Sequence, residues 1–218
     1  MRFLSLLAVL PSIALAQGIP LKSGATSDLA TVNSAKSLFT VRGKSTAATY
    51  QCVALGLTTT AAYTMQLDAE AGRGLRIQKI CVGSTVATAA ALQTVTIQRR
   101  TTASTGGTAA TAEGTSSPAV SKLDQAEAGG NYSGRCAVTP TLGTAGAVLD
   151  GWGQTVGELG AGAADPGGPA VFCKNYGNES EKAIAVSAGT ANGISVSVSS
   201  AGAGGLAAGS ITIMFIAE

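Results

Sequence analysis

Apolar and polar residues alternate along several stretches of the chain with the period of two that is typical of β-strands. The alternation is clearest over residues 63–70 (YTMQLDAE). It places Tyr63, Met65, Leu67 and Ala69 on one face and Thr64, Gln66, Asp68 and Glu70 on the other. A strand with one buried and one solvated face is therefore predicted. Residues 75–83 (LRIQKICVG) follow after a glycine-containing turn, and the two stretches are expected to form a β-hairpin.

Three further stretches, residues 92–101, 193–200 and 210–218, show the same alternation. Their inward positions are predicted to be Val95, Ile97, Ile194, Val196, Val198, Ile211, Ile213 and Phe215. The last stretch also carries Met214 and Ile216 on its second face. We therefore expect this strand either to be buried on both faces or to lie at a subunit contact.

Segments rich in Gly, Ala, Ser and Thr separate these strands, and together they predict an all-β fold. Many short strands with turn signals between them are typical of a β-sandwich, here expected to be jelly-roll-like and to occupy residues 46–218. Residues 17–45 hold few large apolar side chains and predict an extended N-terminal arm. One strand is expected within this arm, at residues 36–43.

The first sixteen residues, MRFLSLLAVLPSIALA, have the pattern of a secretory signal peptide. A basic start precedes an apolar run, and Ala14 and Ala16 fit the small-residue rule for cleavage before Gln17. The apolar run is too short for a transmembrane helix, which needs about 20 residues. No membrane partner is expected after cleavage. The alternatives are that residues 1–16 form an apolar arm that packs on a neighbouring subunit, or that they result from a start codon placed too early.

Charged residues make up only 12% of the chain, and the net charge is +2 from 14 basic and 12 acidic residues. The basic residues are scattered and form no face suited to phosphates, so nucleic acid is not an expected partner. Low charge density lets a surface pack against copies of itself without strong repulsion. It weakly favours an assembly over a lone soluble enzyme.

The sequence contains no histidine. This excludes Ser-His-Asp and Cys-His nucleophile pairs as well as imidazole metal ligands. Asp68 and Glu70 would share one face of a strand and are the candidate for a glycosidase-like carboxylate pair. A solvated strand face is the favoured interpretation of the same two residues. We expect no enzyme activity, no catalytic residue, no cofactor and no metal site.

Four cysteines, Cys52, Cys81, Cys136 and Cys173, have none of the spacings of common zinc or thioredoxin sites. In an exported protein they predict two disulfides, with three possible connectivities. In a reducing cytoplasm they would be small buried side chains. The sequence leaves both alternatives open.

The chain's single tryptophan, Trp152, lies between two glycines. A lone tryptophan more often anchors a core or an interface than it stacks on a sugar. Trp152, Met214 and Ile216 are therefore the candidate residues of an oligomer contact.

Residues 19–43 (IPLKSGATSDLATVNSAKSLFTVRG) resemble the N-terminal arm of structural proteins of tailed bacteriophage virions, whose motif is close to P-x-K-S-G-x-T-S-D-L-x-T-V-D. The matching residues are Pro20, Lys22, Ser23, Gly24, Thr26, Ser27, Asp28, Leu29, Thr31 and Val32, whereas Asn33 replaces the acid. Residues 95–114, 120–128 and 192–218 are similar to later parts of the same proteins. The resemblance implies a jelly-roll-like capsid decoration or head-fibre protein without enzymatic residues, often a trimer. Its expected partners are its own copies and a capsid or other virion protein, and its expected location is the virion.

A secreted binding module is the alternative function. The signal-like segment and the even number of cysteines favour a disulfide-stabilised, extracellular β-sandwich that recognises a surface glycan or protein.

Overall fold

A computed structural model describes residues 30–32, 38–40, 47–57, 62–86, 91–126, 130–156, 170–177, 183–201 and 206–218. The chain divides into two units, Met1–Ser45 and Thr46–Glu218. In the first unit, β1 (Ala30–Val32) pairs antiparallel with β2 (Leu38–Thr40). The strand expected at residues 36–43 contains β2, whereas β1 was not predicted. The signal-like segment, residues 1–16, lies outside the described residues.

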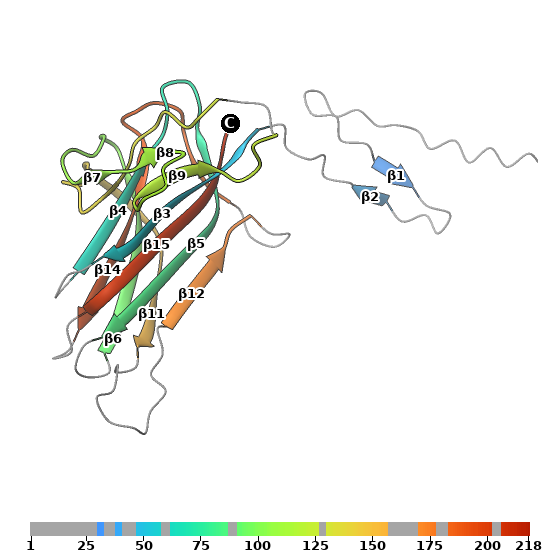
Figure 1. Cartoon of the computed structure of the whole chain (residues 1–218). Coiled ribbons are helices and arrows are strands. Elements are labelled where there is room, and N and C mark those ends of the chain that lie inside the picture. The colour runs from blue at the N-terminus through green and yellow to red at the C-terminus, as the bar shows by residue number, and fades with distance from the viewer. Residues whose placement is uncertain are drawn as a thin grey trace, which may run out of the picture. The chain divides into compact units, whose positions relative to one another are not determined.

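The second unit is a β-sandwich of two sheets, and the described residues include no helix (Figure 1). Sheet 1 has the order β11-β6-β14-β4-β10-β7, and sheet 2 has the order β12-β5-β15-β3-β9-β8 with β13 also paired to β5. The strands are β3 (Thr49–Leu57), β4 (Ala62–Asp68), β5 (Leu75–Val86), β6 (Ala91–Arg100), β7 (Thr108–Ala109), β8 (Thr111–Ala112), β9 (Ala119–Lys122), β10 (Cys136–Val138), β11 (Ala145–Val156), β12 (Ala170–Asn175), β13 (Ile184–Val186), β14 (Gly193–Ala201) and β15 (Leu206–Ala217). The predicted all-β sandwich is therefore confirmed.

The connections agree with the jelly-roll-like expectation. Strands β3, β4, β5 and β6 alternate between the two sheets, and β11, β12, β14 and β15 alternate in the same way. Each sheet therefore contains a central run of four strands, in which neighbouring strands are antiparallel. These runs are β11-β6-β14-β4 in sheet 1 and β12-β5-β15-β3 in sheet 2. Two interleaved Greek keys give this order.

The hairpin predicted for residues 63–70 and 75–83 is wrong. β4 belongs to sheet 1, where it pairs with β14 and β10, and β5 belongs to sheet 2, where it pairs with β15, β12 and β13. The intervening residues carry the chain across the sandwich. An alternation with a period of two shows which face of a strand is buried, and both strands do bury one face in the same core. The alternation does not identify the neighbouring strand.

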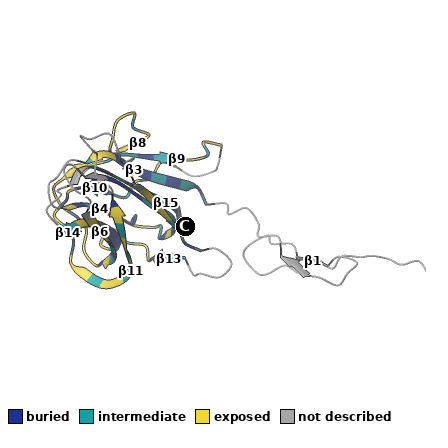
Figure 2. Cartoon of the chain, turned by 90° about the horizontal axis from the view of Figure 1, so that it is seen from below, coloured by how far each residue is buried: buried dark blue, intermediate teal, exposed yellow. Residues whose placement is uncertain are grey.

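The core lies between the sheets, where the inner strand faces are buried (Figure 2). All eight inward positions predicted on the last three stretches are buried there. The chain has few aromatic residues, yet three of them meet at one end of the core. The ring of Phe215 lies 5.7 Å from that of Tyr50 and 4.9 Å from that of Tyr132. Such offset and edge-on contacts add to the free energy that burial contributes.

Candidate functional site

The polar side chains at the end of β4 and just after it are buried, not solvated, and this corrects the favoured interpretation of Asp68 and Glu70. Gln66 is fully buried, and Asp68 and Glu70 retain only 2% and 5% exposure. Residues 101–106 and 133–144 supply the hydrogen bonds that make this burial possible. These loops come from distant parts of the sequence, so the local alternation of residues carried no sign of them.

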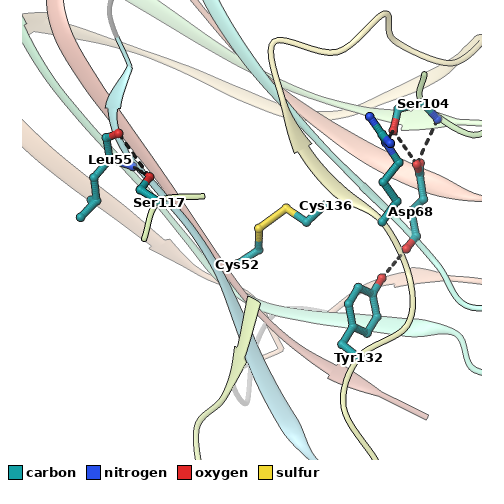
Figure 3. Close-up of a disulfide and its surroundings, with 8 residues drawn as sticks. Cys52, Leu55, Asp68, Ser104, Ser117, Tyr132 and Cys136 are labelled. Carbon is teal, nitrogen blue, oxygen red and sulfur yellow. Dashed lines mark hydrogen bonds between the residues drawn. A yellow bond between two sulfur atoms is a disulfide. The ribbon is translucent and has the colours of Figure 1, made fainter. Parts of the chain in front are cut away.

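The carboxylate of Asp68 accepts hydrogen bonds from other groups of the same chain. Ser104 donates to Oδ2 from its backbone N–H at 3.0 Å and from its hydroxyl at 2.7 Å, and the side-chain amide of Gln66 donates to Oδ1. Arg135 donates to the hydroxyl of Ser104 at 3.1 Å, which extends the network. Figure 3 shows Asp68 between Ser104 on one side and Tyr132 on the other.

Glu70 accepts hydrogen bonds from a second set of donors. Arg73 forms a two-pronged ion pair with it, with Nη2 at 2.7 Å from Oε1 and Nε donating to Oε2. Ser133 adds a backbone and a hydroxyl donor to Oε1. Burial alone would raise the pKa of Glu70, but the hydrogen bonds and the charge of Arg73 outweigh it, so the pKa is lowered from its ordinary value. The hydrogen bonds that Arg73 donates to Glu70 in turn raise the pKa of Arg73.

The two carboxylates are therefore directed to different partners, although they lie only two residues apart. Each has both oxygens engaged by side chains or backbone of the same chain. A glycosidase-like pair needs two carboxyl groups that flank a substrate, one of them poised to donate a proton. This geometry instead fastens loops to the end of β4.

Tyr132 is a member of this cluster that the sequence did not indicate. Its hydroxyl donates to the backbone carbonyl of Asp68, and its ring packs against the rings of Tyr50 and Phe215. Burial raises the pKa of this phenol well above its ordinary value, and the nearby charges of Glu70 and Asp68 raise it further. Tyr132 is therefore a neutral hydrogen-bond donor at any physiological pH.

The four cysteines form two disulfides of different kinds. Cys52 on β3 and Cys136 on β10 are 0% and 2% exposed, and their bond joins the two sheets through the core (Figure 3). Cys81 on β5 and Cys173 on β12 are directly paired across adjacent strands, with 4.0 Å between their Cα atoms. Cys173 is exposed. The second disulfide therefore fastens an edge strand from the outside.

Trp152, one of the three candidate interface residues, lies where the edge strands of the two sheets face each other. We call this place the β11–β12 seam and define it by Trp152 and Asp150 on β11 and Phe172 and Lys174 on β12 with the following Tyr176. The rings of Trp152 and Phe172 are 5.2 Å apart. The carboxylate of Asp150 pairs with Lys174 at 2.8 Å and accepts a hydrogen bond from Tyr176 at 2.7 Å. Side chains, not backbone hydrogen bonds, join the two edges here.

The electrostatics of the seam keep Asp150 ionised. Burial would raise the pKa of Asp150, but the hydrogen bonds of Lys174 and Tyr176 and the backbone N–H of Gly151 lower it overall. Further along β11 and on the neighbouring β6, three buried polar atoms of the described residues make no hydrogen bond: Nε2 of Gln93, Nε1 of Trp152 and Oε1 of Gln154. The two glutamine side chains are joined at 3.0 Å.

Met214 and Ile216 are not brought together with Trp152. Both lie on β15, a central strand of sheet 2, and both are half-buried on its outer face. Their register neighbours are polar or charged: Gln51 and Lys79 beside Met214, and Thr49 and Arg76 beside Ile216. The three candidate interface residues thus occupy two separate surfaces.

Within the described ranges, no group of three or more Cys, Asp or Glu side chains has the arrangement of a metal site. Nor does the described part of the chain contain a helix long and apolar enough to cross a membrane. Comparison with protein-family models, with curated proteins and with solved structures gave no match for this chain.

Proposed function

We propose that this chain is a non-enzymatic structural protein of a virus particle, attached to a phage capsid and displayed there as an oligomer. The observation that carries the proposal is the distribution of side chains. The buried carboxylates of Asp68 and Glu70 are used in hydrogen bonds that hold the fold together, and six large apolar side chains of the described residues are exposed. Exposed apolar side chains of this kind are suited to contacts with other copies or with other virion proteins.

The resemblance of residues 19–43 to the arm of tailed-phage virion proteins is the basis of the proposed location. In this proposal the arm, residues 17–45, tethers the chain to the shell or to a neighbouring subunit, and the sandwich faces outward. A segment with few large apolar side chains gains order by packing on a partner. Self-association also suits a sandwich, because contacts between copies cover strand edges that would otherwise recruit other chains.

Deletion of residues 17–45 tests the proposal. We expect the truncated protein to keep both disulfides and its thermal unfolding transition but to be missing from purified particles. Mass spectrometry of particles made with full-length or truncated protein gives the readout. Normal incorporation of the truncated protein, or absence of the full-length protein from particles, would overturn the proposal.

A second candidate function is a secreted binding module, and the two disulfides favour it. Disulfides persist in oxidising compartments, and the exposed Cys173 would be reduced most easily in a cytoplasm. The intact mass of the naturally produced protein, measured without reduction, separates the candidates. A chain that begins at Gln17, carries two disulfides and is free in the medium supports the secreted module. A chain that begins near Met1 and co-purifies with particles supports the virion protein.

A further inference from the structure

Three polar atoms on the inner side of sheet 1 are buried without a hydrogen-bond partner, and among the described residues they are the only such side-chain atoms. They are Nε2 of Gln93, Nε1 of Trp152 and Oε1 of Gln154. Gln93 is fully buried. Buried polar groups in proteins nearly always have a partner, because an unmade hydrogen bond there costs free energy. Three unpaired atoms in one place therefore indicate that a group from outside the chain completes their hydrogen bonding.

The three residues form one cluster on neighbouring strands. Gln154 on β11 lies directly opposite Gln93 on β6, and the amide of Gln154 donates to Oε1 of Gln93 at 3.0 Å. Trp152 precedes Gln154 by two residues, so both side chains point from β11 to the inside of the sandwich. Rotating both amides by half a turn would reverse their mutual bond and still leave one donor and one acceptor unpaired. The need for a partner is therefore the same in either orientation of the amides.

The unpaired atoms define the kind of group that would fit. The amide of Gln93 and the indole of Trp152 present N–H donors, and Gln154 presents a carbonyl acceptor. A hydroxyl oxygen can accept two hydrogen bonds while its proton donates a third. An ionised carboxylate has no proton for Gln154, and an ammonium group has no lone pair for the two donors. The cluster therefore matches a neutral hydroxyl group.

Aromatic side chains lie beside the cluster. The rings of Trp152 and Phe172 are 5.2 Å apart across the β11–β12 seam, and Phe172 is 42% exposed. A sugar ring combines hydroxyl groups with apolar C–H faces, and sites for small ligands typically join aromatic surface with a few polar groups. A sugar would therefore use both parts of this surface, whereas a water molecule would use only the polar part.

The seam can admit such a ring while both sheets stay intact. Among the described strands, β11 and β12 do not pair with each other, so side chains and not backbone hydrogen bonds join the two edges. Phe172 is the exposed member of these side chains, and exposed side chains change rotamer within nanoseconds. The Cys81–Cys173 disulfide holds β12 on β5 during such a movement. We therefore place the entrance at Phe172.

From these observations we infer that the β11–β12 seam holds a binding site for a neutral carbohydrate. One sugar hydroxyl would accept hydrogen bonds from Gln93 and Trp152 and donate one to Gln154, while an apolar face of the ring covers Phe172. The inference goes beyond the proposed function and does not depend on it, because the site would serve a displayed virion protein and a secreted module alike.

Titration of the full-length protein with sugars tests the site. Trp152 is the chain's only tryptophan, so tryptophan emission reports on the seam alone. The probes are free glucose, galactose, mannose and N-acetylglucosamine, and calorimetry with the same probes detects binding that leaves the emission unchanged. We expect a saturable response to at least one of these sugars.

Two glutamine variants form a matched pair. Gln154→Leu removes the acceptor of the sugar hydroxyl, whereas Gln51→Leu makes the same change on the outer face of sheet 2. Gln154→Leu should weaken binding at least about tenfold, since a hydrogen bond is lost, and Gln51→Leu should leave binding unchanged. If Gln154→Leu does not keep both disulfides and the wild-type unfolding midpoint, Phe172→Ala takes its place. The same weakening is then expected, because the sugar ring loses its aromatic contact.

A saturable response to none of the probes would overturn the inference and would mean that water alone completes the cluster. Equal weakening by the seam variant and by Gln51→Leu would also overturn it, as would unchanged binding by the folded seam variant. Binding that the seam variant alone weakens supports the inference, whether or not the protein is found in particles.

Discussion

The hydroxyl of Tyr132 donates a hydrogen bond to the backbone carbonyl of Asp68, across 64 residues of sequence. This bond fastens the segment before β10 to the end of β4, and the ring of Tyr132 contacts the rings of Tyr50 and Phe215 below it. One side chain thus serves both the polar and the aromatic part of this end of the core. Its two contributions are separable by substitution.

We expect Tyr132→Phe to lower the free energy of unfolding by about 1–2 kcal/mol, because a buried hydrogen bond is lost while the ring contacts remain. Tyr132→Leu removes the ring contacts as well and is expected to cost about 1–2 kcal/mol more. Denaturant unfolding of the two variants and the wild type measures both differences. Equal stability of Tyr132→Phe and the wild type would show that the bond to Asp68 contributes nothing.

Glu70 should make stability depend on pH. Its pKa is lower in the folded protein than the ordinary value of 4.5. A group whose pKa is lowered on folding contributes stability that is fully present above its unfolded pKa and is lost as the pH falls through its folded pKa. We therefore expect the unfolding midpoint of the wild type to decrease as the pH falls below about 4.5, in part because protonation of Glu70 releases Arg73 and Ser133.

The matched variant is Glu70→Gln, which keeps the size of the side chain but removes the charge. It should be less stable than the wild type by about 1–2 kcal/mol at pH 7, since a hydrogen-bonded ion pair is lost. The difference should shrink as the pH falls below about 4.5. Thermal unfolding of both proteins across this pH range is the measurement, and a difference that stays constant with pH would contradict the assigned role.

The sequence allowed the class of fold and the buried faces of the long strands to be predicted, because both depend on local alternation. Ile97, Val196 and Ile213 were assigned inward for that reason, and all three are buried. The partners of the strands were not predictable in this way, since β4 and β5 alternate alike but belong to different sheets. The burial of Asp68 was missed because Ser104 and Tyr132, which bind it, approach from 36 and 64 residues away.

The seam shows the same limit. Trp152 was identified as an anchor from its rarity and its size, but nothing near it in the sequence indicates that Phe172 is its ring partner. The ion pair between Asp150 and Lys174 also depends on how the edges of two sheets meet. Local patterns do not encode such contacts.

Gly143 should tolerate no side chain. A Cβ at this position would lie 1.9 Å from the carbonyl oxygen of Thr102, and that backbone is itself held to Gln66. The N–H of Gly143 donates to Gln66 at 2.9 Å, and its carbonyl accepts from Arg100 at 3.0 Å. We expect Gly143→Ala to lower stability by about 3 kcal/mol or more, because the clash also displaces these buried hydrogen bonds.

Gly72→Ala is the control for this substitution, since a Cβ at Gly72 would meet no atom within 4 Å. It should change stability by no more than about 0.5 kcal/mol. Chemical unfolding of the two variants gives the comparison. Similar stability of Gly143→Ala and Gly72→Ala would contradict the close approach of the loops over β4.

The two disulfides should differ in their rate of reduction, although they close loops of similar length. They span 84 and 92 residues, so the loop-closure entropy they remove from the unfolded chain is nearly the same. Access differs: Cys173 is exposed on an edge strand, whereas Cys52 and Cys136 are buried between the sheets. A thiol reductant attacks a sulfur atom directly, so the buried bond is reached only when the sandwich opens.

We expect dithiothreitol under native conditions to reduce Cys81–Cys173 at least about tenfold faster than Cys52–Cys136. Alkylation at successive times, followed by peptide mass spectrometry, resolves the two rates in one sample. In denaturant the rates should converge, because access to both bonds becomes equal; this serves as the control. Faster native reduction of Cys52–Cys136 would contradict this expectation. It would mean that the two sheets separate more readily than a reductant reaches the edge strand. The packing between β3 and β10 would then be weaker than the burial of Cys52 and Cys136 indicates.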